Sequence, residues 1–307
     1  MLHEKIAARS TGLVFYGLTP PKVTTDLERR TFIAQKQKER LQGIPVDGLL
    51  LYDIQDEATR TDEERTFSFV PTLTPEDYSR QYLADLEIPK IIYKSIGNLN
   101  KAQFTEWILA NQDVEYSVFV GASSRKQIEL TNFTLKDAYE LKKELANHFV
   151  LGGVTIPERH TRKGDEHERL FNKSNDGCRF FVSQCVYSMN DTKNLLSDYY
   201  YSALDNNQEL HPIIFTLSPC GSLRTLKFME WLGIEVPKWL YNDLKHSKDI
   251  LASSVETCKH IASEIIEFAE KKKIPIGFNI ESVSIKKDEI DASTQLLRDI
   301  VKFMKGV

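Results

Sequence analysis

Long hydrophobic runs, a secretory leader and a strong charge of either sign are all missing from this sequence. No apolar run approaches the roughly 20 residues that a membrane-spanning helix needs. The first ten residues, MLHEKIAARS, lack the apolar core of a signal peptide. The net charge of −4 gives no electrostatic reason to bind nucleic acid or an anionic membrane. We therefore expect a cytoplasmic protein with no nucleic-acid or membrane partner, and the oligomeric state stays open.

Paired cysteines and metal-binding spacings are also absent. The cysteines of the chain are Cys178, Cys185, Cys220 and Cys258. They form no CxxC pair, so free thiols in a reducing compartment are the simplest interpretation. His160 and His167 lack the i, i+4 spacing with which two histidines on one helix bind a metal. We therefore predict no metal site.

Short apolar segments alternate along the chain with longer amphipathic ones. The amphipathic segment 26–43 ends at Gly43, and 74–86 opens with a threonine cap, a proline and two acids, as helices do. Further helical stretches lie at about 221–272 and after about 288. The segments expected to be buried strands are 12–18, 46–54, 88–96, 115–123, 149–156, 179–187, 211–219 and 274–285.

Such alternation requires parallel strands joined by crossover helices. An open doubly wound sheet and a closed (β/α)₈ barrel both satisfy it. No GxGxxG follows the first strand, and no GxxxxGK[ST] motif occurs anywhere in the chain. Regular repetition of the unit then favours the barrel. We predict an α/β fold: a single (β/α)₈ TIM-barrel domain over residues 1–307, with extra helices before the last strand.

In this fold the active site lies at the C-terminal ends of the strands. Gln184 is unusual there, because it places a primary amide inside the apolar stretch RFFVSQCVYS. Adjacent Gly152 and Gly153 suggest close approach of backbone or ligand. The long polar segment 55–73 is typical of a functional loop. The polar side chains expected at the strand ends are Tyr52, Asp53, Lys94, Ser95, Ser123, Ser124, Thr155, Glu158, His160, Gln184, Thr216, Ser218, Asn279, Glu281 and Ser282.

The central part of the chain resembles methylenetetrahydrofolate reductases. PERH at 157–160, followed by DEHERLFNKSNDGCRFFVSQCVYS, is similar to that family's Pro-Glu-x-His turn, its helix with an acid and a lysine, and its Thr-Gln strand end. LVFYGLTPP and FTLSPCGSLRTLKFMEWLGIEVPKWL resemble the flanking family segments more loosely. The resemblance covers most of the chain and is strongest over 150–188.

The resemblance implies a barrel that reduces 5,10-methylenetetrahydrofolate to 5-methyltetrahydrofolate with hydride from NAD(P)H, with or without FAD. It places Gln184 at the pterin edge of the folate, where an amide can both donate and accept hydrogen bonds. The lysine at 173 would suit a diphosphate electrostatically. The residues that it places beside the ribityl, diphosphate and adenosine parts of FAD are His160, Glu166, Arg169, Asn172 and Lys173.

Two acidic positions of the family are missing. Aligning on Pro20-Pro21 puts Gly17 where the family has the glutamate that donates a proton for ring opening. Ala122 stands where the family has an aspartate near flavin and pterin. Losses around the flavin suit the family's flavin-independent branch, in which the nicotinamide transfers hydride directly to the folate. LGGVTIPERH also looks more like that branch.

Three functions stay open. In the first, the protein is a reductase whose acid has moved to Asp53 or Glu281, because a general acid must lie within hydrogen-bond reach of the leaving nitrogen. In the second, a pterin pocket serves another one-carbon reaction. In the third, the barrel binds folate without turnover. Structural alternatives exist for both acids: Asp53 could pair with Lys94, and Glu281 could act as a supporting hydrogen-bond partner beside Ser282.

Overall fold

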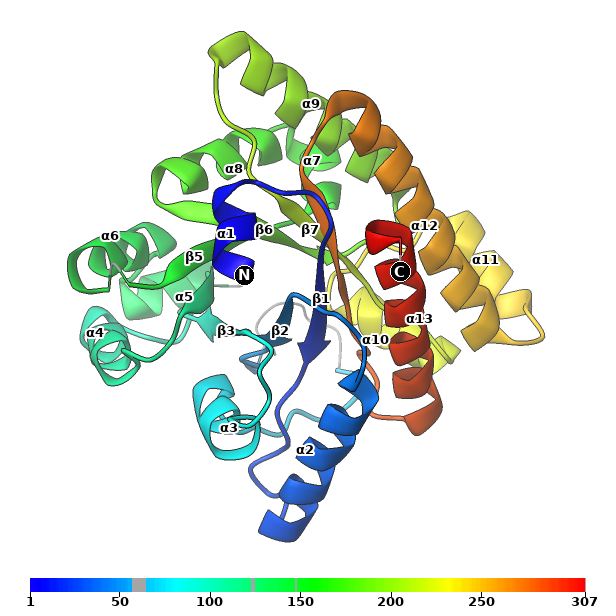
Figure 1. Cartoon of the computed structure of the whole chain (residues 1–307), viewed down its shortest axis with the longest axis horizontal. Helices are drawn as coiled ribbons and strands as arrows, with labels where there is room; N and C mark the ends of the chain where they lie inside the picture. The colour runs from blue at the N-terminus through cyan, green and yellow to red at the C-terminus, as the bar shows by residue number, and fades with distance from the viewer. Residues whose placement is uncertain (57–64, 123–124, 147, 307) are drawn as a thin grey trace.

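A closed barrel of parallel strands forms the centre of the computed structural model, which describes residues 1–56, 65–122, 125–146 and 148–306 (Figure 1). Each strand pairs with the next, and β8 returns to β1, with Phe15 opposite Asn279. The predicted (β/α)₈ barrel is confirmed. The strands are β1 Leu13–Leu18, β2 Gly48–Leu51, β3 Lys90–Ser95, β4 Tyr116–Val120, β5 Val150–Thr155, β6 Cys178–Cys185, β7 Ile213–Leu217 and β8 Ile276–Ile280.

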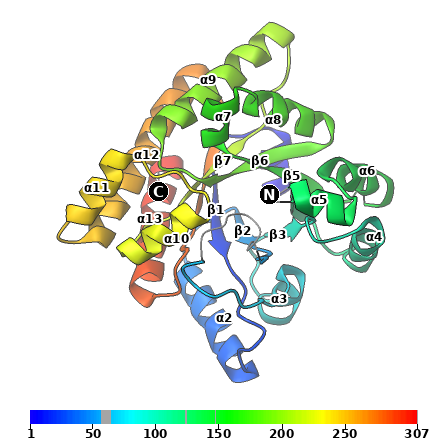
Figure 2. The ribbon, with the colours of Figure 1, turned by 180° about the vertical axis from the view of Figure 1, so that it is seen from behind.

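Helices surround the strands in both ribbon views (Figures 1 and 2). The predicted extra helices before the last strand are α10 to α12. Helices α1, α5 and α7 were not expected, because six or seven residues are too few to show a helical period. The helices are α1 Leu2–Ala7, α2 Leu27–Leu41, α3 Pro75–Tyr82, α4 Lys101–Ala110, α5 Arg125–Thr131, α6 Leu135–Leu145, α7 Pro157–Lys163, α8 Glu166–Asn175, α9 Met189–Asn206, α10 Leu223–Trp231, α11 Lys238–His246, α12 Ile250–Lys272 and α13 Lys287–Lys305.

Inward-facing side chains fill the barrel with an apolar core. Phe15, Val118 and Phe180 belong to this core, and the aromatic rings of Phe15 and Phe180 meet edge to face. Leu2 and Ile6 of α1 belong to the same cluster, so α1 closes the N-terminal end of the barrel (Figure 1). The opposite end, at the C-terminal ends of the strands, is left for polar side chains.

The adjacent glycines of β5 make room for neighbouring side chains. A Cβ on Gly152 would lie 2.6 Å from the ring of Phe180. A Cβ on Gly153 would lie 3.2 Å from Cδ of Lys173. The close approach that the glycine pair suggested is therefore present, and side chains of β6 and α8 make it.

Parts of two sequence-based expectations lie outside the described residues. These are 57–64 within the long polar segment 55–73, and Ser123 and Ser124 after β4. Of that segment, the part that the structure describes includes Thr72, which forms an antiparallel bridge with Lys22. Within the described ranges, no helix has the length and apolar character that a bilayer crossing requires.

Replacing Gly152 with alanine tests the packing inside the barrel. The new methyl group would overlap the Phe180 ring, so we expect Gly152→Ala to lower the free energy of unfolding by about 1–3 kcal/mol in urea denaturation. Adding Phe180→Leu to this variant should recover part of the loss, because it removes the ring atoms that the methyl group meets. A Gly152→Ala variant as stable as the parent would contradict this packing.

Candidate functional site

Polar side chains meet inside the mouth of the barrel at the ends of β2, β7 and β8. The amide Nδ2 of Asn279 donates to the hydroxyl of Tyr52 at 2.8 Å and to Oγ1 of Thr216 at 3.2 Å. Thr216 in turn donates to the carbonyl of Ser183 on β6 at 2.8 Å. Asn279 is fully buried, and its Oδ1 has no hydrogen-bond partner among the described residues. The mouth thus holds a connected polar network with one unused buried acceptor.

Glu281 extends this network at the end of β8. Burial raises the pKa of its carboxyl, and hydrogen bonding with Tyr52 and Asn279 only partly offsets that effect. A carboxyl with a raised pKa retains its proton closer to neutral pH, which is what a general acid requires. The structure therefore places one of the two sequence-predicted acids inside the barrel mouth.

Gly17 lies directly beside this carboxyl-bearing side chain. A Cβ at Gly17 would lie 2.8 Å from the ring of Tyr52 and 3.0 Å from Cβ of Glu281. Position 17 therefore has no room for a side chain while Tyr52 and Glu281 are in place. Glu281, from the neighbouring strand, occupies the space next to the position at which the resembled family carries its acid.

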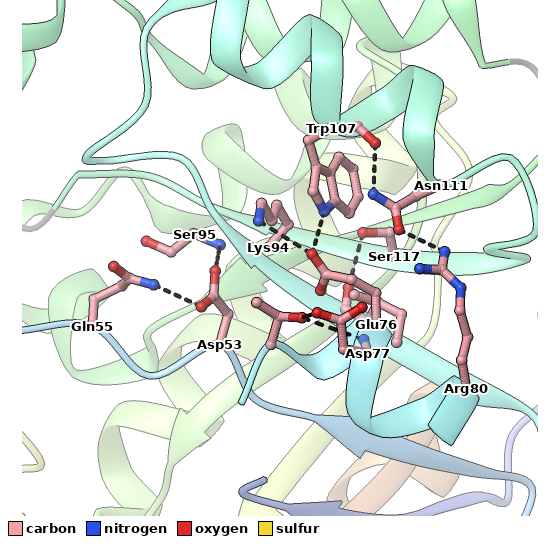
Figure 3. A network of polar contacts seen from close by, with 12 residues as sticks. Asp53, Gln55, Glu76, Asp77, Arg80, Lys94, Ser95, Trp107, Asn111 and Ser117 are labelled. Carbon is pink, nitrogen blue, oxygen red and sulfur yellow. Dashed lines mark hydrogen bonds and ion pairs between the residues drawn. The ribbon is translucent and has the colours of Figure 1, made fainter. Parts of the chain in front are cut away.

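Asp53 belongs to a different set of contacts (Figure 3). Its carboxylate accepts from the backbone N–H of Ser95 at 3.0 Å and from Nε2 of Gln55 at 2.6 Å. Burial raises the pKa of Asp53, while the charge of Lys94 lowers it. The ammonium of Lys94 makes its direct ion pair with Glu76 of α3 at 3.4 Å. Asp53 therefore ties β2 to β3, and these contacts do not join it to Glu281.

Gln184 is held at the mouth by a contact with the extra helices. It is half-buried near the end of β6, within the irregularity in the pairing of β6 with β7 between Val182 and Cys185. Its Nε2 donates to the carbonyl of Leu232, just after α10, at 3.0 Å. The amide thus has a fixed orientation. Its predicted contact with a folate stays a prediction.

The residues that the resemblance assigned to FAD are largely engaged within the protein. Glu166 is fully buried and accepts from the hydroxyl of Thr155, the N–H of Ile156 and the guanidinium of Arg159. The Lys173 ammonium donates to the carbonyl of Val154.

Two more members of that set lie near the surface. Arg169 pairs with Asp165 at 3.1 Å, and Asn172 is exposed. With Glu166 and Lys173 already bonded within the protein, this arrangement does not fit a flavin diphosphate. FAD and NAD(P)H both stay predictions.

His160, the remaining member, lies in a contact that the sequence argument missed. Its ring meets that of His167 at a centroid distance of 5.3 Å, and its Nε2 lies 3.0 Å from a carboxylate oxygen of Asp198. One donor atom from each residue lies within 4.8 Å of the others. This set could hold a divalent cation after a small closure, because zinc bonds are about 2.0–2.2 Å long. The spacing rule for one helix did not apply, since α7 and α8 are separate helices joined around Gly164.

Glu158 is a buried acid that was expected near the strand ends but was given no functional role. Its side chain is 1% exposed, and neither carboxyl oxygen has a hydrogen-bond partner among the described residues. Burial raises the pKa of Glu158 to about 8. The feature that could have pointed to Glu158 was its position in the first turn of α7, directly after the end of β5. The sequence could not show that this acid lacks a partner.

Comparisons with known proteins include a relative that matches over the full length. No protein-family model and no curated protein matches the chain. Among solved structures, an uncharacterized protein from Clostridium thermocellum shares 44% identity over 99% of this chain and 100% of that one, with a TM-score of 0.87. This chain belongs to the same family as that protein. The C. thermocellum member binds two copies of 5-methyl-5,6,7,8-tetrahydrofolic acid.

More distant solved structures share only the fold with the present chain. The Plasmodium falciparum HPPK-DHPS protein with pteroate aligns with 97% of this chain and 48% of its own, at 10% identity and a TM-score of 0.50. A GH10 endoxylanase from a sugarcane soil metagenome aligns with 97% of this chain and 99% of its own, at 8% identity and the same TM-score. Membership of the methylenetetrahydrofolate reductases is not shown by these similarities and stays a prediction.

The raised pKa of Glu158 predicts a pH-dependent stability. The unfolded side chain ionises near pH 4.5, whereas the folded one keeps its proton up to about pH 8. The free energy of unfolding should therefore fall as pH rises through this window, by about 4 kcal/mol at most from this group. Glu158→Gln removes the titration, so urea denaturation at pH 5, 6.5 and 8 should show a smaller fall. The exposed Glu106→Gln is the matched control and should keep the parental slope; equal slopes in both variants would contradict the assignment.

Proposed function

We propose that this protein binds 5-methyltetrahydrofolate, or a closely similar reduced folate, at the mouth of its barrel. The observation that carries the proposal is the full-length relative at 44% identity, which binds two copies of that compound. We propose that this chain also takes two copies. A barrel that binds folate without catalysing a reaction would account for the same observation.

The chemistry of the mouth supports a pterin as the group bound there. A pterin carries hydrogen-bond donors and acceptors along the edge of a flat heteroaromatic ring. The mouth offers the amide of Gln184, the unused Oδ1 of Asn279 and the carboxyl of Glu281. The ring of Tyr52, which packs edge to face on Tyr93 at 4.9 Å, adds an aromatic surface. Few polar groups in a largely apolar wall are typical of small-molecule sites.

A reductase activity is the second candidate, and the position of Glu281 favours it. Reduction of 5,10-methylenetetrahydrofolate requires a proton at the leaving nitrogen N10 as the C–N bond breaks, and then a hydride at the freed one-carbon unit. Glu281 would donate the proton, in place of the acid that the resembled family carries at the position of Gly17. NAD(P)H, as a second substrate, would supply the hydride and leave as NAD(P)⁺, and 5-methyltetrahydrofolate would be the product.

Replacing Gln184 tests the folate site. We expect Gln184→Leu to weaken binding of 5-methyltetrahydrofolate at the mouth by about tenfold, because it removes a polar contact to the ligand. The measurement is isothermal titration calorimetry, with melting temperature followed in parallel. Gln112→Leu is a matched control, since Gln112, just after α4, also donates to a backbone carbonyl, that of Ile108 on α4 at 2.8 Å. Unchanged mouth affinity in a folded Gln184→Leu protein would argue against this site.

The proposed acid predicts a separation of binding from turnover. Glu281→Gln keeps the shape of the side chain but cannot donate the proton, so NAD(P)H oxidation dependent on methylenetetrahydrofolate should fall by about 10²–10⁴-fold. Folate affinity should change far less. Asp53→Asn, outside the Glu281 network, should keep most of the activity. If the parent protein binds folate but oxidises no NAD(P)H, the reductase proposal fails and the binding proposal stands.

A further inference from the structure

A cavity lies at the end of the barrel opposite the mouth. Its volume is about 730 Å³, within the usual range of roughly 300–1,000 Å³ for small-molecule sites. Ala7 of α1, Val150 at the start of β5 and Arg179 near the start of β6 all line it. These residues precede or begin strands, so the cavity belongs to the N-terminal face, beside α1. The mouth residues contribute nothing to it.

The lining of this cavity carries a small excess of positive charge. It holds Arg9, Arg179 and one acid, Glu209, which is 68% exposed and paired with Arg9. One guanidinium nitrogen of Arg179, Nη1, donates to the backbone carbonyls of Ser174 and Cys178. Burial, followed by the charges of Arg179 and Arg9, lowers the pKa of His211 to about 4. The arginines therefore act on the interior of the cavity, where His211 is neutral at physiological pH.

One buried polar group faces this cavity without a partner. The side chain of His211 is only 8% exposed, lines the cavity, and has an Nδ1 with no hydrogen-bond partner in the described part of the chain. Buried polar atoms nearly always have partners in folded proteins. An atom that is left without one inside a cavity is therefore available to a ligand.

The rest of the lining mixes apolar and polar side chains. Ile6, Val150 and Phe171 contribute apolar surface, and the further polar side chains are His3, Ser174, Asn175 and Gln208. The cavity thus combines apolar side chains with two guanidinium groups and the imidazole of His211. A molecule that carries both an aromatic ring system and carboxylates matches this combination, because guanidinium binds carboxylate in a paired geometry.

We propose that this cavity is a second folate site, which holds the glutamate carboxylates of a reduced folate on Arg9 and Arg179 and its aromatic part against the apolar side chains of the lining. The inference rests on the proposed function, in which the chain takes two copies of the ligand. It assigns the second copy to the N-terminal face, where barrels normally carry no catalytic groups. The second site would therefore be a binding site without chemistry.

Two substitutions should move the affinity of this site in opposite directions. Arg179→Gln removes a carboxylate partner and should weaken the second binding event by about tenfold. Glu209→Gln removes the carboxylate that competes for Arg9, so the same event should tighten several-fold. Both side chains are exposed, and both variants should fold. Arg40→Gln is the matched control, since Arg40 is also paired with a surface carboxylate, that of Asp291 at 3.2 Å.

Calorimetric titration with 5-methyltetrahydrofolate separates this inference from the proposed function. We expect two binding events in the parent, one weakened by Gln184→Leu and the other changed by Arg179→Gln and Glu209→Gln. If neither cavity variant alters any event, the second site is not here and the inference is overturned, whether the parent shows one event or two. A parent protein that binds no folate overturns the proposed function together with the inference. If the parent shows a single binding event that only the cavity variants change, the inference is supported and the assignment of a folate site to the mouth is wrong.

Discussion

Closure of the barrel is the constraint on which the rest of the structure depends. Once β8 pairs with β1, every strand has hydrogen-bonded neighbours on both sides, and every second side chain must point into the same enclosed space. Apolar residues such as Phe15 and Phe180 fill that space, and α1 covers its N-terminal end. Inward-facing polar groups are then confined to the last row of the strands. Tyr52, Asn279 and Glu281 meet there for that reason, although they are far apart in the sequence.

The function of a side chain at the strand ends depends on its position in space more than on its position along the chain. The missing acid at position 17 looked like a loss of function, yet a carboxyl reaches the neighbouring space from β8. Engagement within the protein can also remove a residue from a site. Glu166 matches a cofactor residue by pattern, but its carboxylate is buried against Thr155, Ile156 and Arg159. Both findings limit how far a family's roles transfer by alignment.

The sequence predicted the fold well, because strands and long helices leave regular apolar patterns. It also predicted that Gln184 and Glu281 lie at strand ends, since the barrel fixes where strand ends meet. It failed where helices pack against each other. The contact of His160 with His167 depends on the turn at Gly164, and the isolation of Glu158 depends on which groups do not reach it. The cavity beside α1 could not be predicted either, because the six residues of α1 are too few to show a helical period.

The tight packing around Gly17 also limits how this family can change. The shortest contact of a Cβ at position 17 would be with the ring of Tyr52, so any side chain larger than hydrogen there requires that ring to move first. The contact with position 281 is with Cβ, which every residue except glycine carries, so exchanging Glu281 for another side chain would not by itself make room. Substitutions at 17 and 52 are therefore epistatic, and a relative with a side chain at 17 should differ at 52 as well.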